Sequence, residues 1–194
     1  NIMPLLSQNI SIIETGAHSQ VFRKFFDFLG IKVLIITDID PVNKNEKNRF
    51  IACSAVNATS TSNTSLKSFF NISGDEIFST VTQKSFAEKI TPDNRIRIAY
   101  QIPEDNNGYQ PASFEDSFIG LNKEFIIKQK DGLIEYEALK NFDDYEIEDF
   151  YTFARNKVNK KSAFASSLLY FEDEENTWKV PKYISEGLLW LRKQ

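Results

Sequence analysis

The chain has 194 residues, a formal net charge of −4 and 26% charged side chains. This length predicts one domain with a sizeable core, or at most two small ones, and the charge excludes a global basic field for nucleic acid. The single cysteine, Cys53, excludes an intrachain disulfide framework and a multi-cysteine zinc site, which predicts a reducing cytoplasm as the location. Because no signal-peptide pattern or apolar run of about 18 residues occurs, we predict no membrane segment.

The first half of the chain alternates strand and helix patterns, which is typical of an α/β fold. Apolar runs predict strands over residues 10–14, 32–38 and 95–100. Between the first two, apolar residues recur with helical spacing over residues 18–29, and Gly30 ends that helix. We therefore predict a strand–helix–strand unit with a parallel pair. The core is expected to include Phe22, Phe25, Phe26 and Phe28 of this helix.

The rest of the chain is predicted to change from loop to helix. Residues 41–65 are rich in Asn, Ser, Thr and Lys, which indicates a loop with a short strand near residues 50–53. Short helices are predicted within residues 61–70 and 85–90. Ser113 is the predicted N-cap of a helix with two acids in its first turn. The last third is predicted to be helical over residues 143–158, 162–171 and 181–194.

Two aspartates, Asp38 and Asp40, follow the predicted strand over residues 32–38. That strand is apolar enough to be a central parallel strand covered on both faces. If the extended geometry continues past its end, both carboxylates project to one side, where their repulsion favours a shared cation or proton. Open α/β sheets bind ligands at this edge, so a functional role is favoured. The alternative is that both aspartates only cap a loop or a helix start.

A succession of motifs carries a family resemblance along nearly the whole chain. In order, they are "LIITDIDPV", "TSNTSLKSFF", "RIRIAYQIPE", "SFEDSFIGLN", "KKSAFASSLLY" and "WKVPKYISEGLLWL". Together they resemble the Toprim nuclease region of the OLD (overcoming lysogenisation defect) family, a relative of the Gabija antiphage nuclease subunit. The resemblance implies an α/β fold with a mostly parallel, Toprim-like sheet flanked by helices. It implies a core over residues 1–125 that lacks its first strand, and a helical C-terminal extension over residues 126–194 packed on that core.

The resemblance also assigns a metal-dependent site. Asp38 and Asp40 match ligands of one Mg²⁺ or Mn²⁺ ion, and Ser113 and Glu115 resemble ligands of a second. Lys161 matches the catalytic lysine, which would stabilise negative charge on the transferring phosphoryl group. Without the family, Glu115 would be a first-turn acid favoured by the helix dipole, as Asp116 is, and Lys161 would be a solvated lysine.

Three further residues are candidates for contact with DNA phosphates. Lys67 supplies a cation, and Thr61 and Asn63 supply hydroxyl and amide donors, although both also suit a helix N-cap. His18, the single histidine, excludes a histidine-rich metal site and is expected to be structural.

The resemblance implies a DNA endonuclease that nicks or cleaves phosphodiester bonds, with a role in antiphage defence. Its expected partners are DNA, an upstream ABC-type ATPase domain that alone would use ATP, further copies of the protein and a helicase. The family's first-strand glutamate has no match here, and Glu14 is not a substitute because it is better explained as a strand-end acid. We therefore expect the metal sites to be completed by a longer chain.

Two other classes of function remain open. "DIDPV" also fits haloacid-dehalogenase-like phosphatases, in which Asp38 would be the nucleophile and Asp40 the acid/base. That chemistry needs a later lysine, Lys67 or Lys161, and an acidic pair, for which Asp143 and Asp144 are available. The other class is a non-catalytic Toprim scaffold that binds a protein partner.

Overall fold

The computed structural model describes residues 4–104, 108–171 and 177–192. The chain divides into two compact units, residues 1–102 with 182–194 and residues 103–181, which we name the sheet unit and the helical unit. These limits differ from the boundary predicted after residue 125, and that domain boundary stays a prediction. Each unit is described by itself below.

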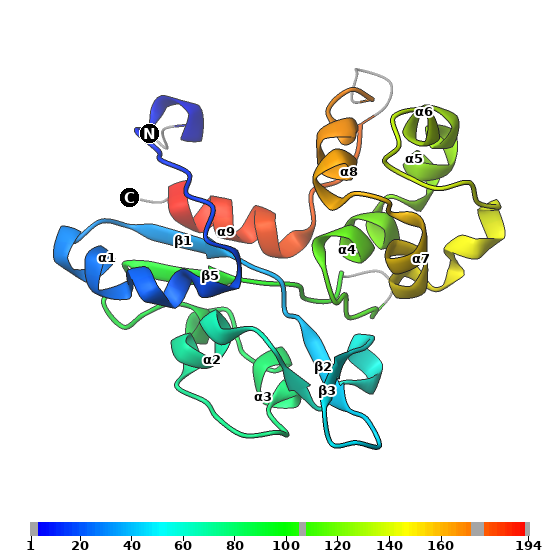
Figure 1. Ribbon diagram of the computed structural model, residues 1–194. Helices are drawn as coiled ribbons and strands as arrows, with labels where there is room; N and C mark the ends of the chain where they lie inside the picture. The colour runs from blue at the N-terminus through cyan, green and yellow to red at the C-terminus, as the bar shows by residue number, and fades with distance from the viewer. Residues whose placement is uncertain (1–3, 105–107, 172–176, 193–194) are drawn as a thin grey trace. The chain divides into compact units, whose positions relative to one another are not determined.

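The sheet unit is built on two parallel strands, β1 (Val33–Ile36) and β5 (Ile96–Ala99), which lie side by side in Figure 1. Every residue of β5 is buried, whereas β1 is only partly buried and Ile36 is exposed. Among the described strands β1 pairs only with β5, so it lies at an edge of this sheet. The prediction of a central strand is therefore wrong for the described chain, and the parallel partner of β1 is β5 and not residues 10–14, for which the pairing was predicted.

A second, antiparallel sheet follows the aspartates. Its strands are β2 (Pro41–Lys44), β3 (Phe50–Ala52) and β4 (Ser60–Thr61), in the order β3-β2-β4. The short strand near residue 50 is confirmed, but β2 lies where a loop was predicted. The hairpin forms because Asn45 Oδ1 accepts hydrogen bonds from the backbone of Lys47 and Arg49, and Asn48 takes the left-handed conformation of the turn.

Short helices complete the sheet unit. In chain order they are η1 (Leu5–Ser7), η2 (Gly16–Phe22), α1 (Arg23–Leu29), η3 (Ala55–Asn57), α2 (Thr64–Phe70), α3 (Phe78–Thr82), η4 (Ala87–Lys89) and α9 (Lys182–Arg192), where η marks a 3-10 helix. One face of the β1–β5 pair packs into a core with α2 and α3, through Ile98, Tyr100, Leu66, Phe78 and Val81.

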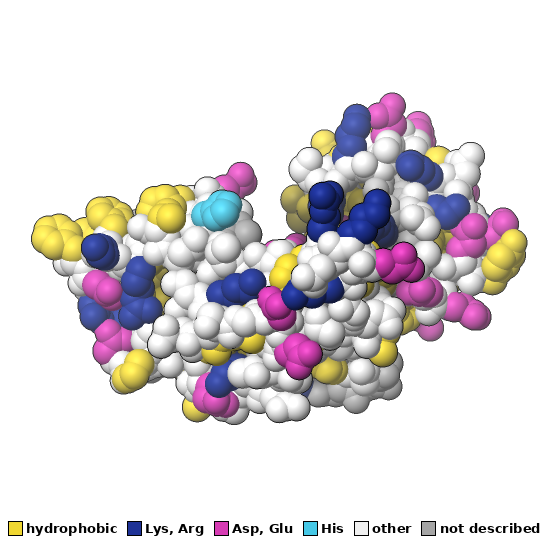
Figure 2. Space-filling model, turned by 60° about the horizontal axis from the view of Figure 1, so that its bottom comes forward, with side chains coloured by type: hydrophobic (Ala, Val, Ile, Leu, Met, Phe, Trp, Pro, Cys, Tyr) yellow, Lys and Arg dark blue, Asp and Glu magenta, His cyan; other side chains and the backbone are white. Residues whose placement is uncertain are grey.

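The first 30 residues differ from the prediction. Residues 10–14 form no strand and pair with none of the described strands. Ile12 is 91% exposed. Helix α1 forms and ends at Gly30 in the left-handed conformation, as expected, but it buries no residue. Phe25 and Phe28 are exposed, so the prediction that this helix belongs to the core is wrong, and Figure 2 shows hydrophobic side chains at the surface here. Periodicity marks an apolar face but does not supply the element that covers it.

Helix α9 packs on the other face of the β1–β5 pair (Figure 1). A Cβ at Gly187 would lie 3.0 Å from a methyl carbon of Leu34, so a glycine permits this close approach. At the end of the helix, Lys32 Nζ donates to the carbonyl of Trp190 at 2.7 Å and lies over its ring. The helix therefore holds both parallel strands, although it is separated from them in sequence by the whole helical unit.

Two cations are buried beside α9. Arg97 of β5 is 1% exposed and pairs with Glu186 of α9, with 3.3 Å between Nη2 and Oε2. Lys89 is 6% exposed and its Nζ lies over the Tyr100 ring. The pKa of Lys89 is lowered to about 8, mainly by burial. The negative charge of Glu186 raises this pKa, and the positive charge of Arg97 lowers it further. The native state therefore disfavours the charged form of Lys89.

This shift predicts a stability that depends on pH. Between about pH 8 and 10.5 the unfolded chain keeps the Lys89 proton and the native state releases it, so the free energy of unfolding rises with pH in this window. Lys89→Met removes the proton, and we expect it to raise the free energy of unfolding at pH 7 by about 3 kcal/mol and to flatten the rise. Urea unfolding at pH 7 and pH 10 checks this. Lys84→Met, at a partly exposed ion pair with Glu88, is the control. Equal pH slopes in wild type and Lys89→Met would contradict the prediction.

The helical unit packs its helices around aromatic side chains. The described helices are α4 (Phe114–Leu121), α5 (Lys123–Lys128), α6 (Lys130–Glu135), η5 (Asp144–Glu148), α7 (Phe150–Lys157) and α8 (Lys161–Leu168). Phe118 is at the centre of the core and contacts the rings of Phe125, Phe164 and Trp178. The α/β fold class with a helical C-terminal part is thus confirmed. In the parts of the chain that the structure describes, no helix has the length and apolar character required to cross a membrane.

Candidate functional site

Asp38 and Asp40 lie just after β1, between the two sheets of the sheet unit. The backbone does not stay extended, because Asp40 has φ of 47° in the left-handed region. Aspartate tolerates this region better than most residues, and such a conformation persists only where its surroundings hold it. Here the backbone N–H of Ser62 donates to the Asp40 carbonyl at 2.9 Å. The two carboxylates are thus placed by a fixed turn and not by the simple strand alternation that the sequence suggested.

Asn63 fixes this turn from the other side. Its Nδ2 contacts Thr37 Oγ1 at 2.8 Å, the Asp38 carbonyl at 2.7 Å and Asp40 Oδ2 at 3.2 Å. Its Oδ1 accepts from Leu66 N at 3.1 Å, so the same side chain is the N-cap of α2. Asn63 is fully buried, and a buried amide with both ends engaged has one orientation.

Thr61 has a related internal contact, since its Oγ1 donates to the Ile39 carbonyl at 2.5 Å. The structure therefore places Thr61 and Asn63 beside the aspartates and engages their side-chain donors within the protein. Their contact with DNA phosphate stays a prediction. Lys67 lies in the last turn of α2 and is partly exposed.

Gln101, at the end of β5, holds Asp38. Its Oε1 accepts from the buried backbone N–H of Ile39 at 2.7 Å, and its Nε2 donates to Asp38 Oδ1 at 2.6 Å. Nε2 also donates to Tyr183 Oη of α9 at 3.2 Å. Gln101 had no predicted role, although a signal was present, because a polar residue directly follows the predicted strand over residues 95–100 at its carboxyl end.

These contacts define the aspartate cluster: Asp38, Asp40, Asn63 and Gln101. Asn63 Nδ2 donates to Asp40 Oδ2 and Gln101 Nε2 donates to Asp38 Oδ1, so an amide orients an oxygen of each carboxylate. Carboxylate oxygens are hard ligands, and Mg²⁺ is commonly held by one or two carboxylates with water and substrate phosphate oxygens in the remaining positions. The cluster therefore fits one such ion. A group of three or more His, Cys, Asp or Glu side chains able to hold a metal does not occur among the described residues.

In the helical unit, Ser113 and Asp116 form the N-terminal cap of α4, as predicted for a helix start. Asp116 is fully buried and accepts hydrogen bonds from Tyr109 Oη at 2.6 Å, the Ala112 N–H at 2.8 Å, and both the N–H and hydroxyl of Ser113. Burial, together with the nearby Asp116 charge, raises the pKa of Tyr109, so its hydroxyl stays a donor. The Ser113 hydroxyl is thus engaged in the cap, and its role as a metal ligand stays a prediction.

Glu115 and Lys161 meet in the same unit although they are far apart in sequence. Glu115 Oε2 lies 3.0 Å from Lys161 Nζ, and the Glu115 side chain is 8% exposed while that of Lys161 is 70% exposed. Lys161 begins α8 directly after Lys160. Two lysines at a helix N-terminus oppose the helix dipole, which favours anions there. Glu115 supplies negative charge beside this cationic helix start and pairs with the Lys161 ammonium.

The structure thus groups the predicted residues into two sets. Asp38, Asp40, Thr61 and Asn63 lie together in the sheet unit, and Ser113, Glu115 and Lys161 lie in the helical unit. Asp143 and Asp144 are the acidic pair that the phosphatase hypothesis requires. In the structure Asp143 caps η5 and Asp144 forms an ion pair with Lys130.

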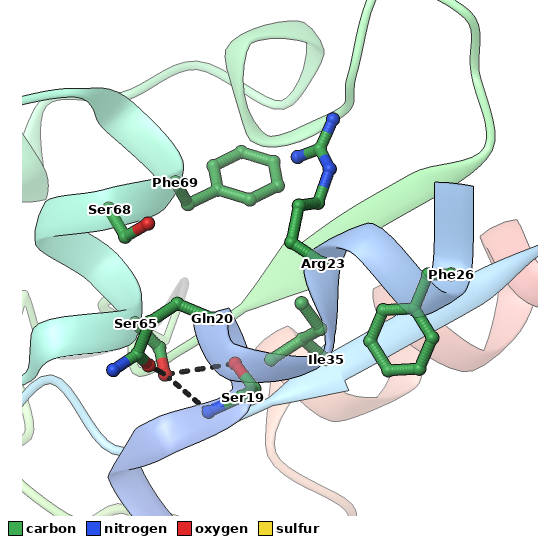
Figure 3. A pocket seen from close by; sticks show the side chains of 8 residues that line it. All are labelled: Ser19, Gln20, Arg23, Phe26, Ile35, Ser65, Ser68 and Phe69. Atoms are coloured by element: carbon green, nitrogen blue, oxygen red, sulfur yellow. Dashed lines mark hydrogen bonds between the residues drawn. The ribbon is translucent and has the colours of Figure 1, made fainter. Parts of the chain in front are cut away.

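One pocket of the sheet unit lies between η2, α1, β1 and α2 (Figure 3). Its polar side chains bind each other: Ser65 Oγ accepts from Ser19 N and Ser19 Oγ and donates to Gln20 Oε1, each at 2.9 Å. Arg23, which also lines it, pairs with Asp27. These contacts fasten α2, and with it Asn63, to the N-terminal helices.

Comparisons with known proteins address the family resemblance. A family model for the TOPRIM domain of overcoming lysogenization defect protein-like proteins matches residues 1–40. The chain is 32% identical over 189 residues to Endonuclease GajA from Bacillus cereus (strain HuB5-5). That alignment covers 92% of this chain and 26% of the relative, so the chain spans about a quarter of the relative's length. No solved structure gives a significant match. The resemblance read from the motifs is therefore confirmed, and the chain is similar to OLD-like Toprim proteins.

Proposed function

We propose that the chain is the nuclease region of a longer protein and cleaves or nicks DNA with divalent metal ions. The observation that carries the proposal is the aspartate cluster, in which two carboxylates are oriented by Asn63 and Gln101 just after β1. The similarity to a protein named as an endonuclease supports the same reaction class.

In this proposal Asp38 and Asp40 hold one Mg²⁺ or Mn²⁺ ion, and Glu115 with Ser113 holds a second. The bound ions would supply Lewis-acid stabilisation of the phosphodiester and of the oxygen that leaves. The protein's own contribution is orientation, because Asn63 and Gln101 fix carboxylate oxygens before any substrate arrives.

Lys161 supplies positive charge beside Glu115 in the helical unit. Its ammonium is kept near Glu115 at 3.0 Å, and its largely exposed side chain can reach a phosphate in solvent. Phosphodiester cleavage increases negative charge on the transferring phosphoryl group, so a fixed cation there lowers the barrier. Lys67, Thr61 and Asn63 remain lesser candidates for DNA contact.

The proposed partners follow from the family and from the length of the relative. They are DNA, an ATPase domain elsewhere in the longer polypeptide, further copies of the protein and a helicase. ATP would act only through the ATPase domain, and antiphage defence is the proposed biological role. The glutamate on the family's first strand would come from that longer polypeptide.

The direct test is plasmid nicking by the full polypeptide that contains this chain, with Mg²⁺ or Mn²⁺ and with a chelator. Hydrolysis of p-nitrophenyl phosphate is measured in parallel. We expect metal-dependent nicking and no phosphatase activity. Phosphatase activity without nicking would instead support Asp38 as a nucleophile, and inactivity in both assays would favour a non-catalytic scaffold.

A further inference from the structure

Gln101 connects Asp38 to helix α9. Its amide has one possible orientation, because the buried Ile39 N–H must meet an acceptor and Oε1 provides it at 2.7 Å. Nε2 therefore faces Asp38 Oδ1 at 2.6 Å and Tyr183 Oη at 3.2 Å. Gln101 is fully buried and Tyr183 is 3% exposed, so neither contact competes with bulk water.

From this geometry we infer that Gln101 and Tyr183 are positioning residues for Asp38. This inference rests on the proposed metal-dependent function. Nε2 directs one carboxylate oxygen of Asp38 toward the protein, and the hydrogen bond to Tyr183 keeps the amide plane fixed. The plane of the Asp38 carboxylate is thereby fixed, and ligands with a fixed orientation bind metal better than mobile ones.

Gln101 and Tyr183 lie next to the two points where the chain leaves and re-enters the sheet unit. Residues 103–181 form the helical unit, so the chain leaves the sheet unit directly after Ile102 and returns at Lys182. Gln101 and Tyr183 are each adjacent to one of these two points. The hydrogen bond between them joins the two ends of the inserted unit, so a displacement of either end would loosen the support of Asp38.

The test compares Tyr183→Phe and Gln101→Leu with Tyr100→Phe. Tyr100 is a matched control, because it is fully buried in the same unit and its hydroxyl donates to the Val81 carbonyl, not to Gln101. For each full-length protein, the Mn²⁺ affinity is measured by electron paramagnetic resonance of free Mn²⁺, and stability is measured by urea unfolding. We expect Tyr183→Phe to weaken Mn²⁺ binding about 3-fold and Gln101→Leu to weaken it about 10-fold or more. Tyr100→Phe should lower stability and leave Mn²⁺ affinity unchanged.

Equal Mn²⁺ affinity in wild type and Gln101→Leu would overturn the inference, as would equal loss of affinity in Tyr183→Phe and Tyr100→Phe. If Gln101→Leu does not fold, Tyr183→Phe alone decides. If wild type binds no Mn²⁺, the proposed metal site fails, and positioning is judged by nuclear magnetic resonance of the Gln101 side-chain amide. Its signals should shift in both Asp38→Asn and Tyr183→Phe; unchanged signals in these variants would refute the contact.

Discussion

Asp38→Asn and Asp40→Asn should each reduce metal-dependent DNA nicking by at least about 100-fold, because loss of a ligand costs more than the 10- to 100-fold cost of losing a group that orients one. Asparagine keeps the shape of aspartate and can still accept from Gln101 Nε2 or Asn63 Nδ2 through its amide oxygen. The fold should therefore survive. Nicking rates at saturating Mn²⁺ and urea unfolding midpoints measure the two effects.

The control for this prediction is Asp75→Asn. Asp75 is an aspartate of the same unit whose side chain is 57% exposed and pairs with Lys44, so its loss should leave nicking unchanged. Full nicking by both Asp38→Asn and Asp40→Asn would remove the aspartate cluster from the proposed reaction. A fall in nicking matched by a fall in the unfolding midpoint would assign the aspartates a structural role instead.

Lys161→Met should reduce the nicking rate by about 100-fold with a smaller effect on DNA affinity, because a fixed cation acts mainly on charge that develops in the transition state. It also leaves the buried Glu115 carboxylate without its lysine. Since Lys161 is 70% exposed, solvent screens this pair, and we expect a loss of about 1 kcal/mol in the free energy of unfolding. Nicking rates, DNA-binding titrations and urea unfolding measure the three quantities.

The double variant Glu115→Gln/Lys161→Met separates catalysis from stability. Removing both charges should restore the free energy of unfolding, because no buried carboxylate remains unpaired, while nicking stays low. Lys160→Met is the control, since Lys160 is the preceding residue and forms an exposed pair with Glu137. Recovery of nicking in the double variant would show that the pair serves only the fold.

Much of the local structure could be predicted because it depends on short-range chemistry. Ser113 and Asp116 cap α4, Asn63 caps α2 and Gly30 ends α1, since each places a suitable side chain or a left-handed residue at a helix end. The apolar runs at residues 32–38 and 95–100 form strands as expected.

The covering of apolar faces could not be predicted from periodicity. The run at residues 10–14 and the phenylalanines of α1 have the patterns of a buried strand and helix, yet Ile12, Phe25 and Phe28 are exposed. Burial requires a second surface, and a pattern within one segment carries no information about whether that surface is present.

The sequence by itself determined the α/β class, the helix ends and the candidates Asp38 and Asp40, because these follow from local patterns. Glu115 and Lys161 became candidates through the family resemblance that the order of the motifs carries. Only the tertiary structure decided how those residues are held. It brought Lys161 to Glu115 across 46 positions, Gln101 to Asp38 from just beyond β5, and Tyr183 of α9 to Gln101. Such contacts depend on long-range packing, and the hydrogen bonds of a single buried amide are invisible until its neighbours are in place.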